Sequence, residues 1–250
     1  MGREWPSPKD LAGAAIQTAL TDSGQSAQLS AAIDCIAAIR TFEDSGLSMG
    51  TGTPDNVPQS YAQAGGVEPD HFLYADIGGQ SPQAMVNEMA GAVRRGEYRA
   101  VLIAGAEANG TAKRARKQSV KLDWTQKSDR DYDNRISSFA ILSRAEIRNG
   151  IISMPLAYSL IETARRARLG LGVTGYEAEM AALWAAFSER SLERIHAQFA
   201  RKWDAGALQS GGDGNYRLTQ IYRRWMVAQD AVDVAAALIL TRAVLPANWG

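Results

Sequence analysis

The turn between residues 77 and 82 is the part of this 250-residue chain whose residue types best support chemistry. Its sequence, IGGQSP, predicts a tight turn into a helix, with Ser81 as the N-cap and Pro82 as the first helical residue. Free N–H groups at a helix start favour a thiolate, an oxyanion or a phosphate. Ser81 is the only hydroxyl there and is therefore the candidate catalytic residue. Gly78 and Gly79 allow close backbone approach to a bound group, or simply supply positive φ.

A serine nucleophile needs a base beside it, and the chain has only two histidines. His71 opens a strand that ends at the turn, so at roughly 3.3 Å per residue it should lie about 20 Å from Ser81. His196 cannot be placed beside Ser81 from the sequence. We therefore favour a plain capping role for Ser81 over a catalytic one. Cys35, in an apolar segment, is expected to be a small core residue.

Composition and charge exclude several classes of protein. Lys+Arg and Asp+Glu both number 27, so no overall field draws the chain to nucleic acid or to an anionic membrane. A single cysteine excludes an intrachain disulfide framework and a cysteine-built metal site, and it fits a cytoplasmic location. No stretch approaches the roughly 20 apolar residues that span a bilayer. We expect a cytoplasmic protein with no metal, no membrane span and no nucleic-acid partner.

Hydrophobic periodicity and turn signals define the elements that must position the turn. The expected helices cover residues 10–23, 57–64 (with Asn56 or Asp55 as its cap), 82–95, 154–169, 176–202 (with a capping box at Thr174 and Glu177) and 217–229. The expected strands cover residues 32–42, 71–77, 99–106 and 232–240, all but the second as buried strands. The order strand, helix, strand over residues 71–106 implies a parallel α/β unit with a right-handed crossover.

Four segments together resemble the N-terminal domain of thiolases, more closely the acetyl-CoA acetyltransferase-like and sterol-carrier-thiolase branch. They are AIDCIAAIRTF (32–42), the run from YADIGGQSP to AGAEA (74–108), ARKQSVKLDW (115–124) and AVDVAAALILTRA (231–243). The second segment is the most specific. In that superfamily a strand ends at the catalytic turn, a helix carries the nucleophile at its N-terminus, a glycine closes the helix, and a strand ending in Gly-Ala or Gly-Glu follows.

The departures from the thiolase pattern concern the catalytic residues. A thiolase carries its nucleophile in an N-x-x-C-x-S-G turn, and the matching turn here, Ile77 to Ser81, contains no cysteine. Cys35 lies on a different strand. The family's second half, with its Gly-His-Pro histidine and Cys-Gly-Gly proton donor, has no counterpart before the chain ends at Gly250. We therefore expect one half of a two-half fold.

The resemblance implies a site for an acyl-CoA thioester, with no covalently bound cofactor. Gly78 and Gly79 would contact the acyl group. Arg114 and Lys117, in a basic run from residue 113 to 117, would hold the phosphates of coenzyme A, and Trp124 would stack on its adenine. The alternative for such a charge run is a solvated loop or helix face.

The resemblance also implies the fold, the domains and the function. We expect an α/β fold with a mostly parallel sheet flanked by helices, formed by residues 1–106 and 231–250, and an inserted, mainly helical subdomain over residues 107–230. By family the chain would be an acyltransferase of the acetyl-CoA C-acyltransferase type. Without the Cys-His-Cys set, the alternative is a non-catalytic or truncated subunit that binds acyl-CoA or completes a site with a partner. Apolar residues around most of helix 82–94 predict a homodimer or a complex with a separately encoded second half.

Overall fold

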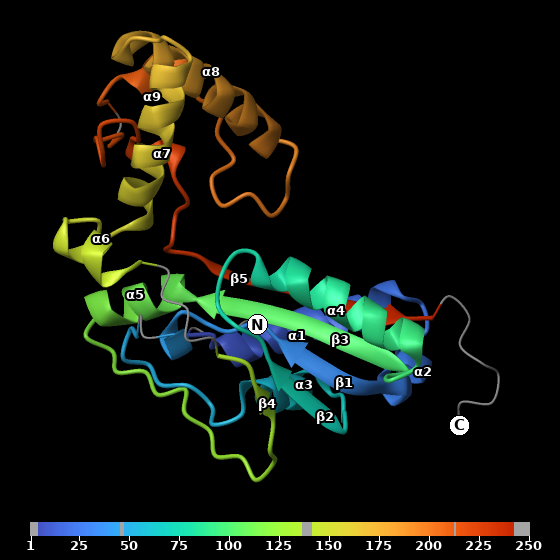
Figure 1. Ribbon diagram of the computed structural model, residues 1–250. Helices are drawn as coiled ribbons and strands as arrows, with labels where there is room; N and C mark the ends of the chain where they lie inside the picture. Colours follow the sequence, from blue (N-terminus) through green and yellow to red (C-terminus); the bar gives the residue numbers. More distant parts are fainter. Residues whose placement is uncertain (1–4, 46–47, 137–141, 213, 243–250) are drawn as a thin grey trace. The chain divides into compact units, whose positions relative to one another are not determined.

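A computed structural model describes residues 5–45, 48–136, 142–212 and 214–242 of the chain (Figure 1). The chain divides into two compact units. The first comprises residues 1–138 together with 230–250, and the second comprises residues 139–229. The first unit contains the sheet and the turn at residue 78, so it positions the candidate site.

A five-stranded sheet forms the centre of the first unit, in the order β4-β2-β1-β3-β5. Its strands are β1 (Ile33–Ala38), β2 (His71–Tyr74), β3 (Ala100–Ala108), β4 (Asp133–Asn134) and β5 (Asp233–Thr241). Every neighbouring pair is parallel except β3 with β5, which is antiparallel. The predicted α/β fold with a mostly parallel sheet is therefore confirmed.

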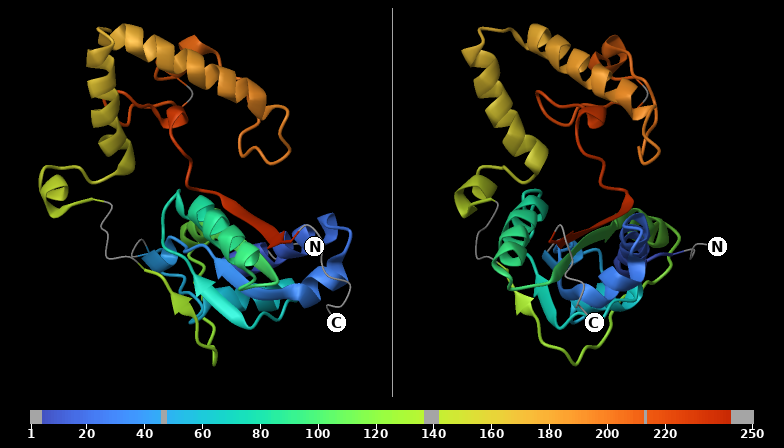
Figure 2. Two further views of the ribbon diagram at one scale, coloured as in Figure 1. Left: turned by 45° about the vertical axis from the view of Figure 1, so that its right-hand side comes forward. Right: turned by 90° about the vertical axis from the view of Figure 1, so that its right-hand side faces the viewer.

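Helices cover both faces of the central strands (Figure 2). On one face, α1 (Pro8–Asp22) and α3 (Val57–Gly65) pack against Ile36 and Leu102. On the other face, α4 (Ser81–Arg95) packs against Cys35 and Val101. Successive side chains of β1 and β3 point to opposite faces because a strand has a two-residue period. Since both faces are buried, the sequences of β1 and β3 are almost continuously apolar. The remaining elements of this unit are α2 (Ser26–Ala32), a short 3₁₀ turn η1 (Glu43–Ser45) and α5 (Asn109–Lys117).

Local signals fix where α1 and α3 begin. Ser7 and Asp10 form a capping box at the start of α1. Asn56, one of the two caps that the sequence offered, accepts a hydrogen bond from the Gln59 N–H (2.9 Å) at the start of α3 and donates another to the carbonyl of Arg130 (3.0 Å). The side chain of Asn56 thereby joins α3 to the segment that leads into β4.

The edge strand β5 is covered on its α1 and α3 face but only partly, at Leu240, on its α4 face, which corrects the prediction of a buried strand. Ala235, Ala237 and Ile239 pack on the α1 and α3 side. Alternate residues on the other side are exposed, with Val234 at 51% and Leu238 at 39%. The sequence pattern is continuous because every side chain of β5 is apolar between residues 234 and 240, so periodicity could not identify an uncovered face.

The second unit is mainly helical. Its elements are α6 (Arg144–Arg148), α7 (Met154–Arg168), α8 (Val173–Ser191), α9 (Ala205–Gln209) and a 3₁₀ turn η2 (Arg224–Met226). Its apolar core includes Ala181, Trp203, Leu208 and Met226.

Three details of the predicted helices in this unit are wrong. The helix predicted over 176–202 ends at Ser191, and its N-cap is Gly172 with no side-chain hydrogen bond, so Thr174 does not form a capping box. The helix predicted over 217–229 is absent, because the buried side chain of Asn215 accepts from the Trp225 N–H (3.1 Å) and donates to the Leu208 carbonyl (2.7 Å). These bonds hold the segment in irregular loops.

Residues 107–138, which the sequence analysis placed in the insertion, group with the sheet in the structure. Arg135 donates its backbone N–H to the Tyr74 carbonyl (2.9 Å), and Asp55 donates its N–H to the Gln126 carbonyl (2.9 Å). Backbone pairing with β2 and with the start of α3 therefore joins this polar segment to the first unit.

We predict that Gly13→Ala destabilises the first unit by about 1–3 kcal/mol. A Cβ atom at Gly13 would lie 2.7 Å from the Ala64 carbonyl oxygen and 2.8 Å from the Ala64 Cβ, so α1 and α3 would have to move apart. The matched control is Gly91→Ala in α4, where the nearest atom, 3.1 Å away, is the flexible end of Arg95. There, higher helix propensity should stabilise by about 0.5–1 kcal/mol. Urea unfolding followed by circular dichroism measures both, and equal effects of the two substitutions would contradict the close contact of α1 with α3.

Candidate functional site

The turn from β2 into α4 is open at its centre. Gly78 has φ of 130°, a conformation that favours glycine, and a Cβ atom there would lie 2.5 Å from the Gln80 side chain. Gly79 is exposed, and a Cβ atom at Gly79 would have no atom within 4 Å beyond those of Gly79 and its two chain neighbours. The turn therefore needs its first glycine for backbone geometry, whereas the second position has room for a side chain.

Ser81 is the first residue of α4 and not its N-cap, which corrects the sequence prediction. Its N–H donates to the Gly78 carbonyl (3.0 Å), so the turn is already helical at Ser81 and the N-cap position falls on Gln80. No side chain accepts a hydrogen bond at this cap, and Pro82 occupies the second helical position. The start of α4 is therefore a helix N-terminus without a side-chain cap, which suits it to a negatively charged group.

The first unit places no imidazole beside Ser81. His71 begins β2, at the opposite end of the strand from the turn, and its ring packs on Tyr98 with 5.4 Å between ring centroids. His196 belongs to the second unit. The ionisable side chain of the turn itself is Asp76, which the sequence analysis passed over and which accepts a hydrogen bond from the Ile77 N–H (2.8 Å). The sequence signal that could have identified Asp76 was its position shortly after a short strand.

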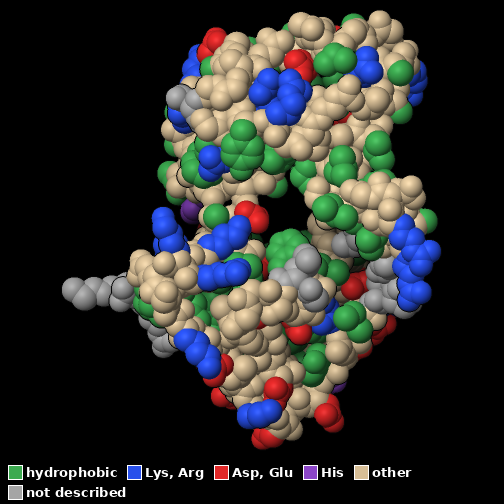
Figure 3. Space-filling model, turned by 90° about the vertical axis from the view of Figure 1, so that its left-hand side faces the viewer, with side chains coloured by type: hydrophobic (Ala, Val, Ile, Leu, Met, Phe, Trp, Pro, Cys, Tyr) green, Lys and Arg blue, Asp and Glu red, His purple; other side chains and the backbone are tan. Residues whose placement is uncertain are grey.

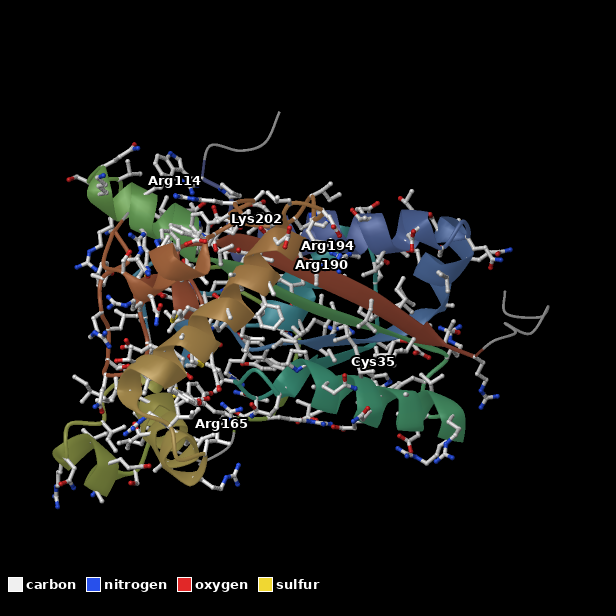
Figure 4. The ribbon with its side chains drawn as sticks, turned by 90° about the horizontal axis from the view of Figure 1, so that it is seen from above. Cys35, Arg114, Arg165, Arg190, Arg194 and Lys202 are labelled. Atoms are coloured by element: carbon white, nitrogen blue, oxygen red, sulfur yellow. The ribbon has the colours of Figure 1, made fainter. Side chains whose placement is uncertain are left out.

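Cys35 is unsuited to nucleophilic chemistry. It is fully buried between the sheet and α4, in the cluster that includes Met85 and Met89. Burial raises the pKa of its thiol to about 12, although a hydrogen bond with Tyr98 acts in the opposite direction. At neutral pH the group is a thiol, and thiols are poor nucleophiles compared with thiolates. Figure 4 shows Cys35 among the strands, with Arg114 on α5.

The basic run from residue 113 to 117 forms the last half of α5. The Arg114 guanidinium pairs with Asp233 at the start of β5 (3.2 Å), and Lys113 pairs with Asp230 (2.6 Å). Asp233 also accepts from the Thr111 N–H (2.7 Å), so these contacts join α5 to β5. Lys117 is exposed in the last helical turn, where a cation also complements the helix dipole.

Trp124 lies apart from the α4 turn and from the basic run of α5. Its N–H donates to the Thr51 carbonyl (2.8 Å), and its half-buried ring lines a cavity on the α1 and α3 side of the sheet. None of Gly78, Gly79, Ser81, Arg114 or Lys117 lines this cavity. The sequence predicted one site from these residues, and in the structure they belong to the α4 turn, to α5 and to the cavity wall.

Two negative findings concern the described residues. Within the ranges that the structure describes, no cluster of three or more His, Cys, Asp or Glu side chains is suited to a metal ion. In the same ranges, no helix is long and apolar enough to cross a membrane. On the face of the first unit shown in Figure 3, Lys/Arg and Asp/Glu side chains both occur, in line with the balanced charge of the sequence.

Comparison with solved structures links this geometry to a family. No family model matches the chain, and no curated protein does. The crystal structure described as a monomeric SCP2-thiolase-like protein type 1 from Mycobacterium smegmatis superposes with a TM-score of 0.71 at 30% identity. The match covers 96% of this chain and 43% of that chain. This chain is a thiolase-like half domain. It spans less than half the length of that relative.

The thiolase motif can now be placed on the α4 turn of this half domain. Only Ser81 matches N-x-x-C-x-S-G: in the register that this serine sets, the motif's cysteine falls at Gly79, its asparagine at Asp76 and its glycine at Pro82. The position of the missing thiol is thus the open position of the turn. The structure retains an uncapped helix N-terminus and lacks the side chain that would use it.

We predict that Gly79→Cys creates a reactive thiol, because a helix N-terminus lowers the pKa of a cysteine. Labelling with a chromogenic disulfide at pH 7 should leave Cys35 unmodified in the folded protein and should modify the Gly79→Cys variant rapidly. The control is Ala90→Cys, an exposed position on the same helix but away from its N-terminus, where labelling should be about 5–10-fold slower. Equal rates at positions 79 and 90, or fast labelling of the unsubstituted protein, would contradict this account of the turn.

Proposed function

We propose that this half domain binds an acyl-CoA thioester without a thiolase nucleophile of its own, and completes its site with a second half. The observation that carries the proposal is the α4 turn. It has the uncapped helix N-terminus and the accessible glycine backbone suited to a thioester carbonyl, yet glycine occupies position 79 where the family motif has cysteine. An acyltransferase that uses Ser81 is the alternative, and it would require a base from outside the first unit.

The phosphates of coenzyme A would bind to the exposed end of α5. Arg114 contributes less to such a site than the sequence suggested, because its guanidinium already pairs with Asp233. Arg116 and Lys117 are exposed in the last turn of α5, and neither takes part in an ion pair with a described residue. Lys117 is therefore the more suitable of the two predicted phosphate ligands.

We predict that Lys117→Glu weakens the binding of acetyl-CoA by about tenfold at low salt, because a phosphate contact is lost and a like charge is introduced. The affinity of the unsubstituted protein should also fall as salt is added. Calorimetric titration measures both effects. Lys127→Glu is the control, since Lys127 is 95% exposed and pairs with Asp55. Equal affinities for the two variants would place the phosphate site elsewhere, and no binding by the unsubstituted protein would overturn the proposed function.

The surface that a second half would cover lies on the α4 side of the sheet. Sequence analysis assigned it to α4, but the large apolar side chains of α4 (Met85, Met89 and Val93) are buried against the sheet. The large uncovered apolar side chains of this side are on β5, where Val234 and Leu238 are exposed together with Ala236 between them. We call this row the β5 stripe. Apolar side chains exposed together on one strand face are typical of an association surface.

The length and the monomeric state of the Mycobacterium smegmatis protein support the same proposal. It is described as monomeric, and less than half of its chain corresponds to this half domain. A monomer of that length has further chain of its own with which to cover the surface that corresponds to the β5 stripe. For this half domain we propose a second copy or a separately encoded second half in that role.

We predict that the protein self-associates at tens of micromolar and binds a hydrophobic dye in the absence of a partner. Leu238→Glu should abolish both effects without unfolding the chain, because Leu238 is 39% exposed. Val120→Glu is the control, at a position that is 37% exposed and lies outside the β5 stripe. Sedimentation velocity distinguishes the species. A well-folded monomer at these concentrations that binds no dye would rule out the association surface.

A further inference from the structure

The second half of α8 (residues 181–191) carries apolar side chains on two sides. Ala181 and Ala185 pack into the apolar core of the second unit. Leu183 and Phe187 lie on the other side of the helix, one turn apart, and each residue is more than half exposed. A surface helix needs only the apolar stripe that packs into its own core, so the outward stripe of α8 is apolar surface that this unit leaves in water.

The chain that follows α8 extends this apolar surface. Ile195 is 93% exposed, and it lines an open hollow together with Phe187. Every residue that lines the hollow lies between positions 187 and 197, so the hollow belongs to the surface of the second unit alone. We call Leu183, Phe187, Ile195 and the two arginines that line the hollow, Arg190 and Arg194, the α8 patch.

Cations border the apolar side chains of the α8 patch (Figure 4). Arg190 and Arg194 line the hollow, and Lys202 lies at the same end of α8. Two carboxylates of this region already have partners, because Glu193 pairs with Arg190 (3.4 Å) and Glu189 pairs with Lys202 (2.5 Å). Arg194 is exposed and takes part in no ion pair with any residue that the structure describes. Its guanidinium is therefore available to an anionic group.

The charge of the second unit favours the same kind of partner. Residues 139–229 contain twelve Lys and Arg and eight Asp and Glu, so this unit carries a positive surplus that the balanced total of the chain conceals. Residues 187–202 alone contain four Lys and Arg and two Asp and Glu. An anionic surface would therefore attract the second unit, and the residues around the α8 patch contribute to that attraction.

Exposed apolar side chains next to arginines fit the surface of an anionic lipid bilayer. Apolar side chains enter the boundary between headgroups and acyl chains, while guanidinium groups pair with the lipid phosphates. Nucleic acid fits less well, because Leu183 and Ile195 are aliphatic and offer no flat ring on which a base could stack. A protein partner would need a recess shaped for the protruding side chain of Ile195, whereas a fluid bilayer needs none.

We propose that the α8 patch docks the second unit on the surface of an anionic phospholipid bilayer. Leu183, Phe187 and Ile195 enter the interface, and Arg190 and Arg194 bind lipid phosphates. The contact is peripheral, in keeping with the finding that no helix in the described part of the chain is long and apolar enough to cross a membrane. The proposal does not depend on acyl-CoA binding at the α4 turn.

Flotation of the full chain with vesicles of phosphatidylcholine and about 30% phosphatidylglycerol tests the proposal. The protein should float with these vesicles at low salt, lose affinity as salt is added, and bind vesicles of phosphatidylcholine alone at least about tenfold more weakly. Arg194→Glu should weaken binding about tenfold. Arg148→Glu makes the same charge change at an exposed position of α6, outside the α8 patch, and should weaken binding less than about threefold.

The apolar part of the α8 patch is tested by Ile195→Ser. Because Ile195 is 93% exposed, the substitution should leave the thermal midpoint of the free protein unchanged. It should weaken binding to the anionic vesicles about 5–10-fold, since an apolar side chain is lost from the interface. Ile152→Ser is the matched control, at a position of the second unit that is 75% exposed and lies outside the α8 patch, and it should have no effect.

A fluorescent label shows directly whether position 195 enters the bilayer. Cys35 is buried, so an environment-sensitive dye should attach to Ile195→Cys at the new thiol. Anionic vesicles should shift its emission to shorter wavelength, whereas the same dye on Ile152→Cys should show no shift.

Leu238→Glu separates the α8 patch from the β5 stripe, and it should float like the unsubstituted protein. Flotation that is lost in Leu238→Glu would assign lipid binding to the β5 stripe and overturn the proposal. Equal binding to neutral and anionic vesicles, equal effects of Arg194→Glu and Arg148→Glu, or an unshifted dye at position 195 would also overturn it. Absence of flotation would overturn it as well and would leave the α8 patch to a protein partner.

Discussion

Burial of the central strands β1 and β3 on both faces is the constraint on which the rest of the first unit depends. Parallel strands with two covered faces need a helical layer on each side, and the alternation of Ile36 and Leu102 with Cys35 and Val101 directs side chains to both layers. A side chain at Gly13 of α1 would collide with Ala64 of α3, so the close spacing of these two helices requires glycine there. With the sheet held in this way, the chain leaving β2 must turn within a few residues to enter α4 on the opposite face.

That turn sets the chemistry available to the half domain. Its helix N-terminus has no side-chain cap and its position 79 is open, but the thiol of the chain is at Cys35, where burial raises its pKa to about 12. A buried thiol in a strand serves packing, and a thiolate at a helix start would serve catalysis. The same layer arrangement leaves the β5 stripe uncovered, because α4 packs against only part of that edge strand. The turn without a nucleophile and the uncovered stripe of β5 therefore both belong to the α4 side of the sheet.

The sequence predicted those elements whose signals are local. The strands at residues 33–38 and 100–108, the helix from 81 to 95 and the Asn56 cap all follow from apolar runs and capping residues. It did not predict features decided by distant residues. Arg114 appeared free for a phosphate because its partner, Asp233, is 119 residues away. Trp124 appeared close to the basic run in sequence, but pairing with Thr51 places it in the wall of a different cavity. Ser81 was predicted to be the N-cap from its residue type. In the structure its backbone N–H bonds to the Gly78 carbonyl, so the helical turn already includes Ser81, and a backbone bond of this kind cannot be predicted from residue type.

Our central proposal is that the α4 turn of this thiolase-like half domain binds a thioester and has no nucleophile of its own. Intact-mass spectrometry after incubation with acetyl-CoA and with acetoacetyl-CoA tests it most directly, because covalent thiolase chemistry transfers the acyl group to the protein. The account predicts that the unsubstituted chain gains no acyl adduct and releases no product above background. An acyl adduct that maps to Ser81 and disappears in Ser81→Ala, while persisting in Cys35→Ala, would contradict it.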